Sequence, residues 1–199
     1  MILGITGGIS TGKTTAARVV AQSGVRIIDC DEVSHYLTDY DATVLTAIYE
    51  HFGSQVFRPY GSLDRTALGR IVFSTEAERR TLEQILHPPI KAVVQANIET
   101  AHAYSEPLVV VAPLLIEANM VGDMDRLWVI SCSPERQLER LCGRSGIEVE
   151  EARTWIASQM SLEEKEKYAD TVIYNDGTLE EFKEAVARAW DVFVADSEH

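Results

Sequence analysis

Gly7-Gly8-Ile9-Ser10-Thr11-Gly12-Lys13-Thr14 is the stretch of the sequence that decides the fold. It matches the pattern G-x-x-x-x-G-K-[ST], and it lies between a short apolar run, residues 2–6, and a segment of helical composition, residues 14–22. Glycines in this context let successive backbone N–H groups point at phosphate oxygens, while the following helix presents the positive end of its dipole. The stretch therefore predicts a phosphate-binding loop, which we call the phosphate loop (residues 7–14).

The residues of the phosphate loop have distinct expected roles. We expect Lys13 to reach the β- and γ-phosphates of ATP and the Thr14 hydroxyl to coordinate Mg²⁺. The residues assigned to nucleotide binding are Gly8, Ser10, Thr11, Gly12, Lys13, Thr14 and Thr15. The pattern specifies a phosphate donor and leaves the acceptor open.

Four further apolar runs follow, at residues 25–28, 108–112, 127–131 and 171–174, with helical patterns between them. Alternating strands and helices predict an α/β fold with a five-stranded parallel sheet and a site at the carboxyl ends of the strands. The long interval after the second run predicts several helices, at residues 41–52, 64–73, 76–86 and 90–104. His87 before Pro88-Pro89 is expected to break the helical pattern there.

The length of 199 residues predicts a single domain built from three parts. A nucleotide-binding core is expected at about residues 1–32, 106–132 and 169–199, a helical insert at about 33–105, and a lid at about 133–168. The insert is interpreted either as the part that binds the acceptor or as a helical layer that packs on the sheet.

Composition narrows the expected partners and compartment. The formal net charge of -13 argues against nucleic-acid binding, because a phosphate backbone would be repelled. The longest apolar run, residues 108–116, is too short to span a bilayer, and the N-terminal residues do not have the pattern of a secretion signal. Three cysteines, Cys30, Cys132 and Cys142, have no paired spacing and suit a reducing compartment. We therefore expect a cytoplasmic protein with no membrane partner.

Asp29-Cys30-Asp31 follows the second apolar run. If the strand persists that far, alternation points the two carboxylates the same way. One carboxylate can take the proton of the acceptor hydroxyl, and one can hold Mg²⁺. We assign the base role to Asp31 and the metal to Thr14, Asp29 and Asp31; the alternative is that Asp31 caps a helix beginning near Glu32. On the third strand no acid appears until Glu117, which is expected to cap a helix or shape the site.

A basic pattern follows the fourth apolar run, where residues 133–135 read Ser-Pro-Glu and predict a helix start. Arg136, Arg140 and Arg144 recur every four residues, so one helical face carries three guanidinium groups. Such a face suits the negative charge of a phosphoryl group during transfer. The alternative is an ordinary surface face on which these arginines pair with residues such as Glu139.

In order and spacing, the pieces of this chain resemble the dephospho-coenzyme A kinase family over nearly the whole length. The pieces are Thr6-Gly7-Gly8-Ile9, Asp29-Cys30-Asp31, Leu86-His87-Pro88, Pro113-Leu114-Leu115-Ile116-Glu117, residues 137–144, Gln159-Met160, Glu164-Lys165, Ala169-Asp170 and Ile173-Tyr174-Asn175. The resemblance implies transfer of phosphate from ATP to the ribose 3′-hydroxyl of dephospho-coenzyme A. It also implies a helical acceptor domain, a lid, Asp31 as general base, Arg140 and Arg144 as lid arginines, and Asn175 near the adenine.

The sequence departs from the family pattern at four positions. The family usually has glycine at Ser10, alanine at Cys30 and arginine at His35, and many members have arginine at Trp155. Two other interpretations stay open. One is a kinase for another small acceptor, such as a nucleoside or nucleotide, and the other is a nucleotide-dependent scaffold with little turnover. For Asn175, a plain turn at residues 175–177 is the alternative to a role near the adenine.

Overall fold

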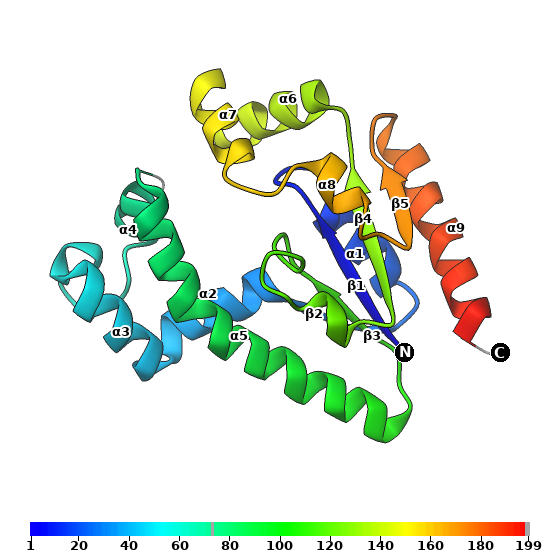
Figure 1. The fold of residues 1–199 in the computed structure, drawn as a ribbon, viewed down its shortest axis with the longest axis horizontal. Coiled ribbons are helices and arrows are strands. Elements are labelled where there is room, and N and C mark those ends of the chain that lie inside the picture. The colour runs from blue at the N-terminus through cyan, green and yellow to red at the C-terminus, as the bar shows by residue number, and fades with distance from the viewer. Residues whose placement is uncertain (73, 198–199) are drawn as a thin grey trace. The chain divides into compact units, whose positions relative to one another are not determined.

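The computed structural model describes residues 1–72 and 74–197 (Figure 1). The chain folds into two compact units. One consists of Met1–Asp29 together with Asn97–His199, and the other is Cys30–Ala96. The first unit contains the sheet, and the second is helical. None of the helices among the described residues has the length and apolar character needed to cross a membrane.

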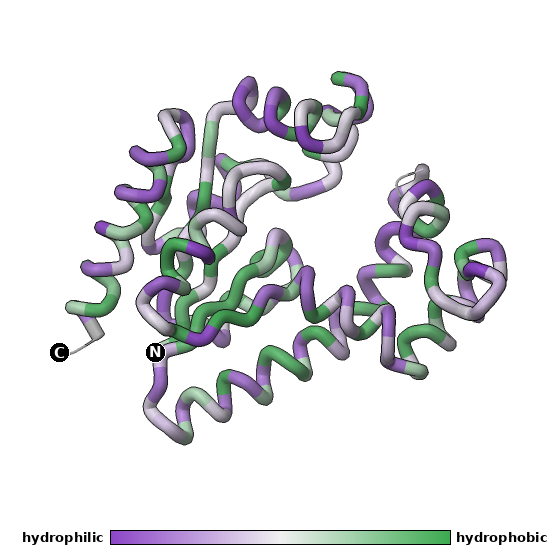
Figure 2. Tube along the Cα trace, turned by 180° about the vertical axis from the view of Figure 1, so that it is seen from behind, coloured by the Kyte–Doolittle hydropathy of each residue, from purple (hydrophilic) through white to green (hydrophobic). Residues whose placement is uncertain are grey.

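The sheet has five parallel strands in the order β2-β3-β1-β4-β5, which confirms the predicted α/β class. The strands are β1 (Ile2–Gly7), β2 (Arg26–Asp29), β3 (Leu108–Val111), β4 (Arg126–Ser131) and β5 (Thr171–Tyr174). All of β1 and β3 is buried, as expected for strands covered on both faces. In Figure 2, much of the strongly hydrophobic colour of this unit lies on the strands of the sheet. β1 lies between β3 and β4, so the chain reverses its direction of winding beside the end of β1.

Helices α1 (Lys13–Ala21) and α9 (Leu179–Ser197) pack against each other and against this sheet. Their buried side chains, Val20 from α1 and Phe182 and Phe193 from α9, join the core formed by the strands. The ring of Trp128 on β4 meets that of Phe193 edge to face, with centroids 6.1 Å apart. This packing holds the start of α1, and with it the phosphate loop, against the sheet.

The segment predicted as a lid, about residues 133–168, contains α6 (Pro134–Ser145), α7 (Val149–Ala157) and α8 (Leu162–Glu166). The short helix η2 (Val121–Asp123) precedes β4. The predicted start of α6 is confirmed, because the Ser133 hydroxyl accepts from the N–H of Arg136 and Pro134 is the first helical residue. Gly146, with φ 63°, ends the helix in the left-handed conformation.

The helical unit comprises α2 (Cys30–Tyr40), α3 (Ala42–Phe52), η1 (Ser54–Val56), α4 (Arg65–Val72) and the first part of α5 (Glu76–Tyr104). The Asp41 carboxylate caps α3 by accepting from two backbone N–H groups. In the same way, Asp64 accepts from the N–H groups of Thr66 and Ala67, and these bonds lower the pKa of its carboxyl group. Of the predicted helix at 64–73, the last residue, Phe73, lies outside the described residues.

The predicted break at His87 is wrong, because α5 runs without interruption through Pro88 and Pro89. Prolines inside a helix remove two backbone N–H donors and crowd the preceding turn. An apolar face stays buried on the turns that follow, at Ile90, Val94, Ile98 and Ala101. Burial of that face favours one continuous helix, and this contribution is not visible in the local sequence.

Candidate active site

The phosphate loop lies at the carboxyl end of β1, and α1 begins at Lys13. Two of its glycines have positive φ, 149° at Gly7 and 111° at Gly12. A Cβ atom at Gly7 would collide with the carbonyl oxygen of Ile130, and one at Gly12 with the side-chain amide of Asn175. Glycine is therefore required at both positions, by the backbone conformation and by the close approach of neighbours.

Ser10 also has a positive φ, 60°, which explains why glycine suits this position in the family that the sequence resembles. Its hydroxyl is buried and has no hydrogen-bond partner among the described residues. Lys13 bends back over the loop, and its Nζ donates to the carbonyl oxygens of Gly8 at 2.7 Å and Gly7 at 3.2 Å. The phosphate loop thus carries both a buried hydroxyl without a partner and an ammonium group, and phosphate oxygens can satisfy both.

Asn175 and Arg140 connect α6 to the phosphate loop. Asn175 follows β5, is buried, and donates through Nδ2 to the carbonyl oxygen of Thr11 at 2.8 Å. Its Oδ1 accepts from Nη2 of Arg140 at 3.2 Å, while Nη1 of Arg140 is buried without a hydrogen-bond partner among the described residues. Burial raises the pKa of the nearby Cys132 thiol, and the Arg140 charge acts in the opposite direction. Asn175 is thus more than a turn residue.

The three arginines of the predicted basic face have different surroundings. Arg136 forms an exposed ion pair with Glu139 at 3.1 Å, which matches the alternative of an ordinary surface face. Arg144 is exposed in the last turn of α6. Arg140 alone of the three is bonded to Asn175 beside the phosphate loop. The helical spacing placed the three arginines on one face of α6. The elements that pack near each arginine decide whether it is exposed, paired with Glu139 or bonded to Asn175.

Two glutamines hold the phosphate loop at Ile9. Gln137 of α6 donates through Nε2 to the Ile9 carbonyl oxygen at 2.9 Å, and Gln159 accepts through Oε1 from the Ile9 N–H at 2.9 Å. Neither glutamine is among the site residues that the sequence predicts. The only signal was that both stand in the pieces that resemble the family, because an isolated glutamine has no recognisable spacing relative to a loop more than a hundred residues away.

The strand that was expected to orient Asp29 and Asp31 alike does not extend to Asp31, so the predicted reason for their shared orientation is wrong. β2 ends at Asp29 and α2 begins at Cys30, so strand alternation does not reach Asp31. Asp31 lies inside the first turn of α2 and is exposed, where an acid interacts favourably with the helix dipole; it is not a cap before Glu32. Asp29 and Ile5 both pair with Val111, which places Asp29 two strand spacings, about 10 Å, from β1.

Glu117 is held in an ion pair. Nζ of Lys165, on α8, lies 2.8 Å from Glu117 Oε1 and also donates to the carbonyl oxygen of Pro113 at 2.7 Å. The side chain of Lys165 is fully buried, and this burial lowers its pKa while Glu117 opposes the shift. Glu117 also accepts from the N–H of Met160. It therefore shapes the site by attaching α8 to the turn that follows β3.

Removing one charge of this pair is expected to destabilise the fold. Glu117→Gln should cost roughly 3 kcal/mol, because the ammonium group of Lys165 stays buried without a counter-charge. Urea unfolding at pH 7 measures the loss. Since the pKa of Lys165 is lowered in the fold, the difference from wild type should shrink as pH rises toward the ordinary lysine value of about 10.4, where the ammonium loses its proton. The double variant Glu117→Leu/Lys165→Met is the control, and equal destabilisation of both variants would contradict this account.

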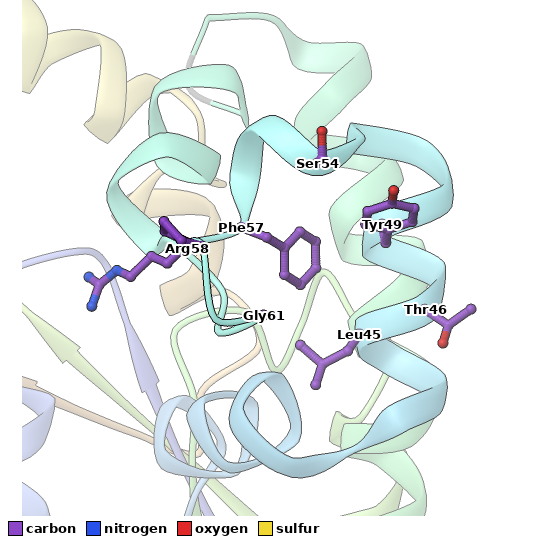
Figure 3. A pocket seen from close by; sticks show the side chains of 8 residues that line it. Leu45, Thr46, Tyr49, Ser54, Phe57, Arg58 and Gly61 are labelled. Atoms are coloured by element: carbon purple, nitrogen blue, oxygen red, sulfur yellow. The ribbon is translucent and has the colours of Figure 1, made fainter.

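The helical unit contains a pocket of about 550 Å³ (Figure 3). It is lined by Leu45, Thr46, Tyr49, Ser54, Phe57, Arg58, Pro59 and Gly61. The rings of Tyr49 and Phe57 meet edge to face at 5.7 Å, and the side chain of Arg58 extends away from them. The pocket is thus largely apolar, with a cationic group at its margin.

On α2 of the same unit, the carbonyl oxygen of His35 accepts from Arg65, which also pairs with Asp39 at 2.9 Å.

The three expected metal ligands are oxygen donors on three elements, with Thr14 on α1, Asp29 on β2 and Asp31 on α2. Thr14 is exposed in the first turn of α1, and Asp29 is half-buried at the end of β2. In the part of the chain that the structure describes, no three or more His, Cys, Asp or Glu residues form a group able to hold a metal. Hydroxyl and carboxylate oxygens suit Mg²⁺, which is commonly held by one or two carboxylates together with substrate phosphates.

A family model described as dephospho-CoA kinase matches residues 1–181. The chain belongs to the dephospho-CoA kinase family. A dephospho-CoA kinase of Symbiobacterium thermophilum is 42% identical over 190 residues, which cover 95% of this chain and 80% of that protein. The structure of TT1252 from Thermus thermophilus is 29% identical with a TM-score of 0.78, covering 98% of this chain and 97% of that chain. That of dephospho-CoA kinase from Campylobacter jejuni is 25% identical with a TM-score of 0.73, covering 98% of each chain.

Proposed function

We propose that this protein transfers the γ-phosphoryl group of ATP to the ribose 3′-hydroxyl of dephospho-CoA, which gives CoA in the last step of its biosynthesis. The observation that carries the proposal is the phosphate loop at the point where the sheet reverses its winding, in a chain of the dephospho-CoA kinase family. We place this activity in the cytoplasm, a reducing compartment that suits three free cysteines.

Charge stabilisation is the main task of the residues around the phosphate loop. Lys13 exchanges its bonds to the loop carbonyls for the β- and γ-phosphate oxygens, and the unpaired Nη1 of Arg140 takes part of the equatorial charge of the transferring group. Arg144 adds a second lid cation. Asn175 holds the loop at Thr11 and lies on the side where the adenine is expected. Thr14, Asp29 and Asp31 are the residues that would hold Mg²⁺, which would neutralise part of the phosphate charge.

The acceptor step is a direct in-line displacement. The 3′-hydroxyl oxygen forms its bond to the γ-phosphorus as the bond from that phosphorus to the bridging oxygen of ADP breaks, and the hydroxyl proton passes to the carboxylate of Asp31. Asp31 follows the end of β2 after a single intervening residue. No phosphoenzyme is formed.

The helical unit supplies the acceptor site in this proposal. Dephospho-CoA has a long pantetheine arm with amide groups and methyl groups, and a largely apolar pocket lined by two aromatic rings matches such a chain. The cationic Arg58 at the margin suits the diphosphate to which that arm is joined. The pocket is therefore the candidate for the arm of the acceptor.

A charge placed in this pocket should weaken acceptor binding alone. Leu45→Glu is expected to raise the KM for dephospho-CoA by about tenfold, a change of about 1.4 kcal/mol, and to leave the KM for ATP unchanged. Steady-state kinetics with each substrate varied in turn measure both constants. Thr43→Glu, exposed on the same helix and outside the pocket, is the matched control. Equal KM values for the two variants would remove the pocket from the acceptor site.

The activity itself is tested by ATP consumption of the purified protein with Mg²⁺. Dephospho-CoA is compared with nucleosides, nucleotides and no acceptor, and the position of the new phosphate is determined on the product. Stimulation by dephospho-CoA with a 3′-phosphorylated product supports the proposal. Stimulation by another acceptor would keep the kinase and replace the substrate, and ATP binding without stimulated turnover would favour a nucleotide-dependent scaffold.

A further inference from the structure

Both backbone polar groups of one phosphate-loop residue are held by side chains of the lid. The Ile9 N–H donates to Gln159 Oε1 and the Ile9 carbonyl oxygen accepts from Gln137 Nε2, each at 2.9 Å. A backbone N–H can only donate and a carbonyl can only accept, so each amide has one orientation that satisfies its partner. The two glutamines thus act with opposite polarity on a single residue.

The surroundings of the two glutamines make these contacts specific. Gln137 is 5% exposed, and its Nε2 occupies the space into which a Cβ atom at Gly8 would project. Gln159 is followed by Met160, whose N–H donates to Glu117, the partner of the buried Lys165. Gln137 is therefore held by its packing against Gly8, and Gln159 by the attachment of the adjacent Met160 to Glu117.

The loop that these amides hold would be costly to order without them. It contains Gly7, Gly8 and Gly12, and glycines lose the most backbone entropy on ordering. Ser10 adds a left-handed conformation with φ 60°. The lid holds the loop at a second point, because Arg140 bonds to Asn175, which bonds to the Thr11 carbonyl oxygen. Contacts on both sides of Ser10 keep the loop in one shape before a nucleotide arrives.

We propose that Gln137 and Gln159 are positioning residues that preorganise the phosphate loop for the nucleotide and couple its shape to the lid. They act through Ile9 and not on the substrate. Because the loop is already ordered before the nucleotide binds, less of the binding free energy is spent on ordering the loop. The proposal rests on the proposed function only for the identity of the nucleotide, and acceptor chemistry plays no part in it.

The opposite polarity of the two amides allows a matched test with one substitution at two positions. Gln137→Glu and Gln159→Glu add the same charge at nearly the same side-chain length. A carboxylate at 159 still accepts from the Ile9 N–H, whereas one at 137 has no hydrogen to donate and faces the Ile9 carbonyl. The Kd for ATP with Mg²⁺, measured by calorimetry without acceptor, should therefore be about 10- to 100-fold weaker in Gln137→Glu than in Gln159→Glu.

Uncharged variants separate this polarity from charge. Gln137→Met and Gln159→Met remove both polar functions, so each should weaken ATP binding by about tenfold while the KM for dephospho-CoA stays within about twofold of wild type. Thermal unfolding without nucleotide identifies any variant that fails to fold. Equal Kd values for the two glutamate variants, or wild-type Kd values for both methionine variants, would overturn the proposal. If the variants show the expected pattern of Kd values but the wild type does not phosphorylate dephospho-CoA, only the proposed function fails.

Discussion

Lys13→Ala is expected to lower kcat for phosphorylation of dephospho-CoA by about 10³-fold or more. The Lys13 ammonium is held directly over the phosphate loop by the carbonyl oxygens of Gly7 and Gly8, so it is in place for the phosphate charge that develops during transfer. A preorganised cation at that position acts mainly on the transition state. Steady-state kinetics at saturating ATP give kcat, and thermal unfolding shows whether the variant folds.

Arg18→Ala is the control for the loss of one positive charge from the same helix. Arg18 is exposed in the last turn of α1, so its removal changes net charge equally and leaves the phosphate loop intact. Its kcat should stay within about twofold of wild type. A Lys13→Ala enzyme that keeps more than a tenth of wild-type kcat would show that the lysine does not stabilise the transferring phosphoryl group.

Asp31→Asn is expected to lower kcat by about 10²- to 10⁴-fold, the usual contribution of a general base. The amide keeps the size of the side chain and cannot accept the hydroxyl proton. Asp31 is exposed in the first turn of α2, so the melting temperature should stay close to that of wild type.

Glu32→Gln is the matched control for Asp31→Asn. Glu32 is the next acid in the same exposed first turn, so both variants lose one negative charge at the start of α2 and one favourable interaction with the helix dipole. Only the aspartate variant should lose turnover. Near-normal kcat in Asp31→Asn, or an equal loss in both variants, would remove Asp31 from the base role.

Much of the sheet and the phosphate loop could be predicted, because their signals are local. A buried parallel strand is a short continuous apolar run, and β5 occupies the same residues, 171–174, that its run predicted. The phosphate loop combines fixed glycine spacing with a strand before it and a helix after it. The start of α6 was equally readable, since a serine cap and a first-position proline act within one turn.

The predictions that went wrong each depended on something beyond a few neighbouring residues. Local rules for Pro88 and Pro89 predict a break, but buried side chains further along α5 favour a continuous helix. The orientation of Asp31 depended on where β2 ends, and element boundaries are poorly specified by pattern. The pairing of Glu117 with Lys165 joins residues 48 positions apart, which no periodicity reveals.

The sequence by itself determined the α/β fold, the position of the phosphate loop and the membership of a kinase family, because these depend on hydrophobic periodicity and on backbone conformations that only certain residues adopt. The tertiary structure alone decided which polar side chains act on that loop. It selected Arg140 from three equally spaced arginines, and it brought Gln137 and Gln159 to the two sides of Ile9. Hydrogen bonds are short and directional, so these partnerships exist only once packing has brought distant segments together.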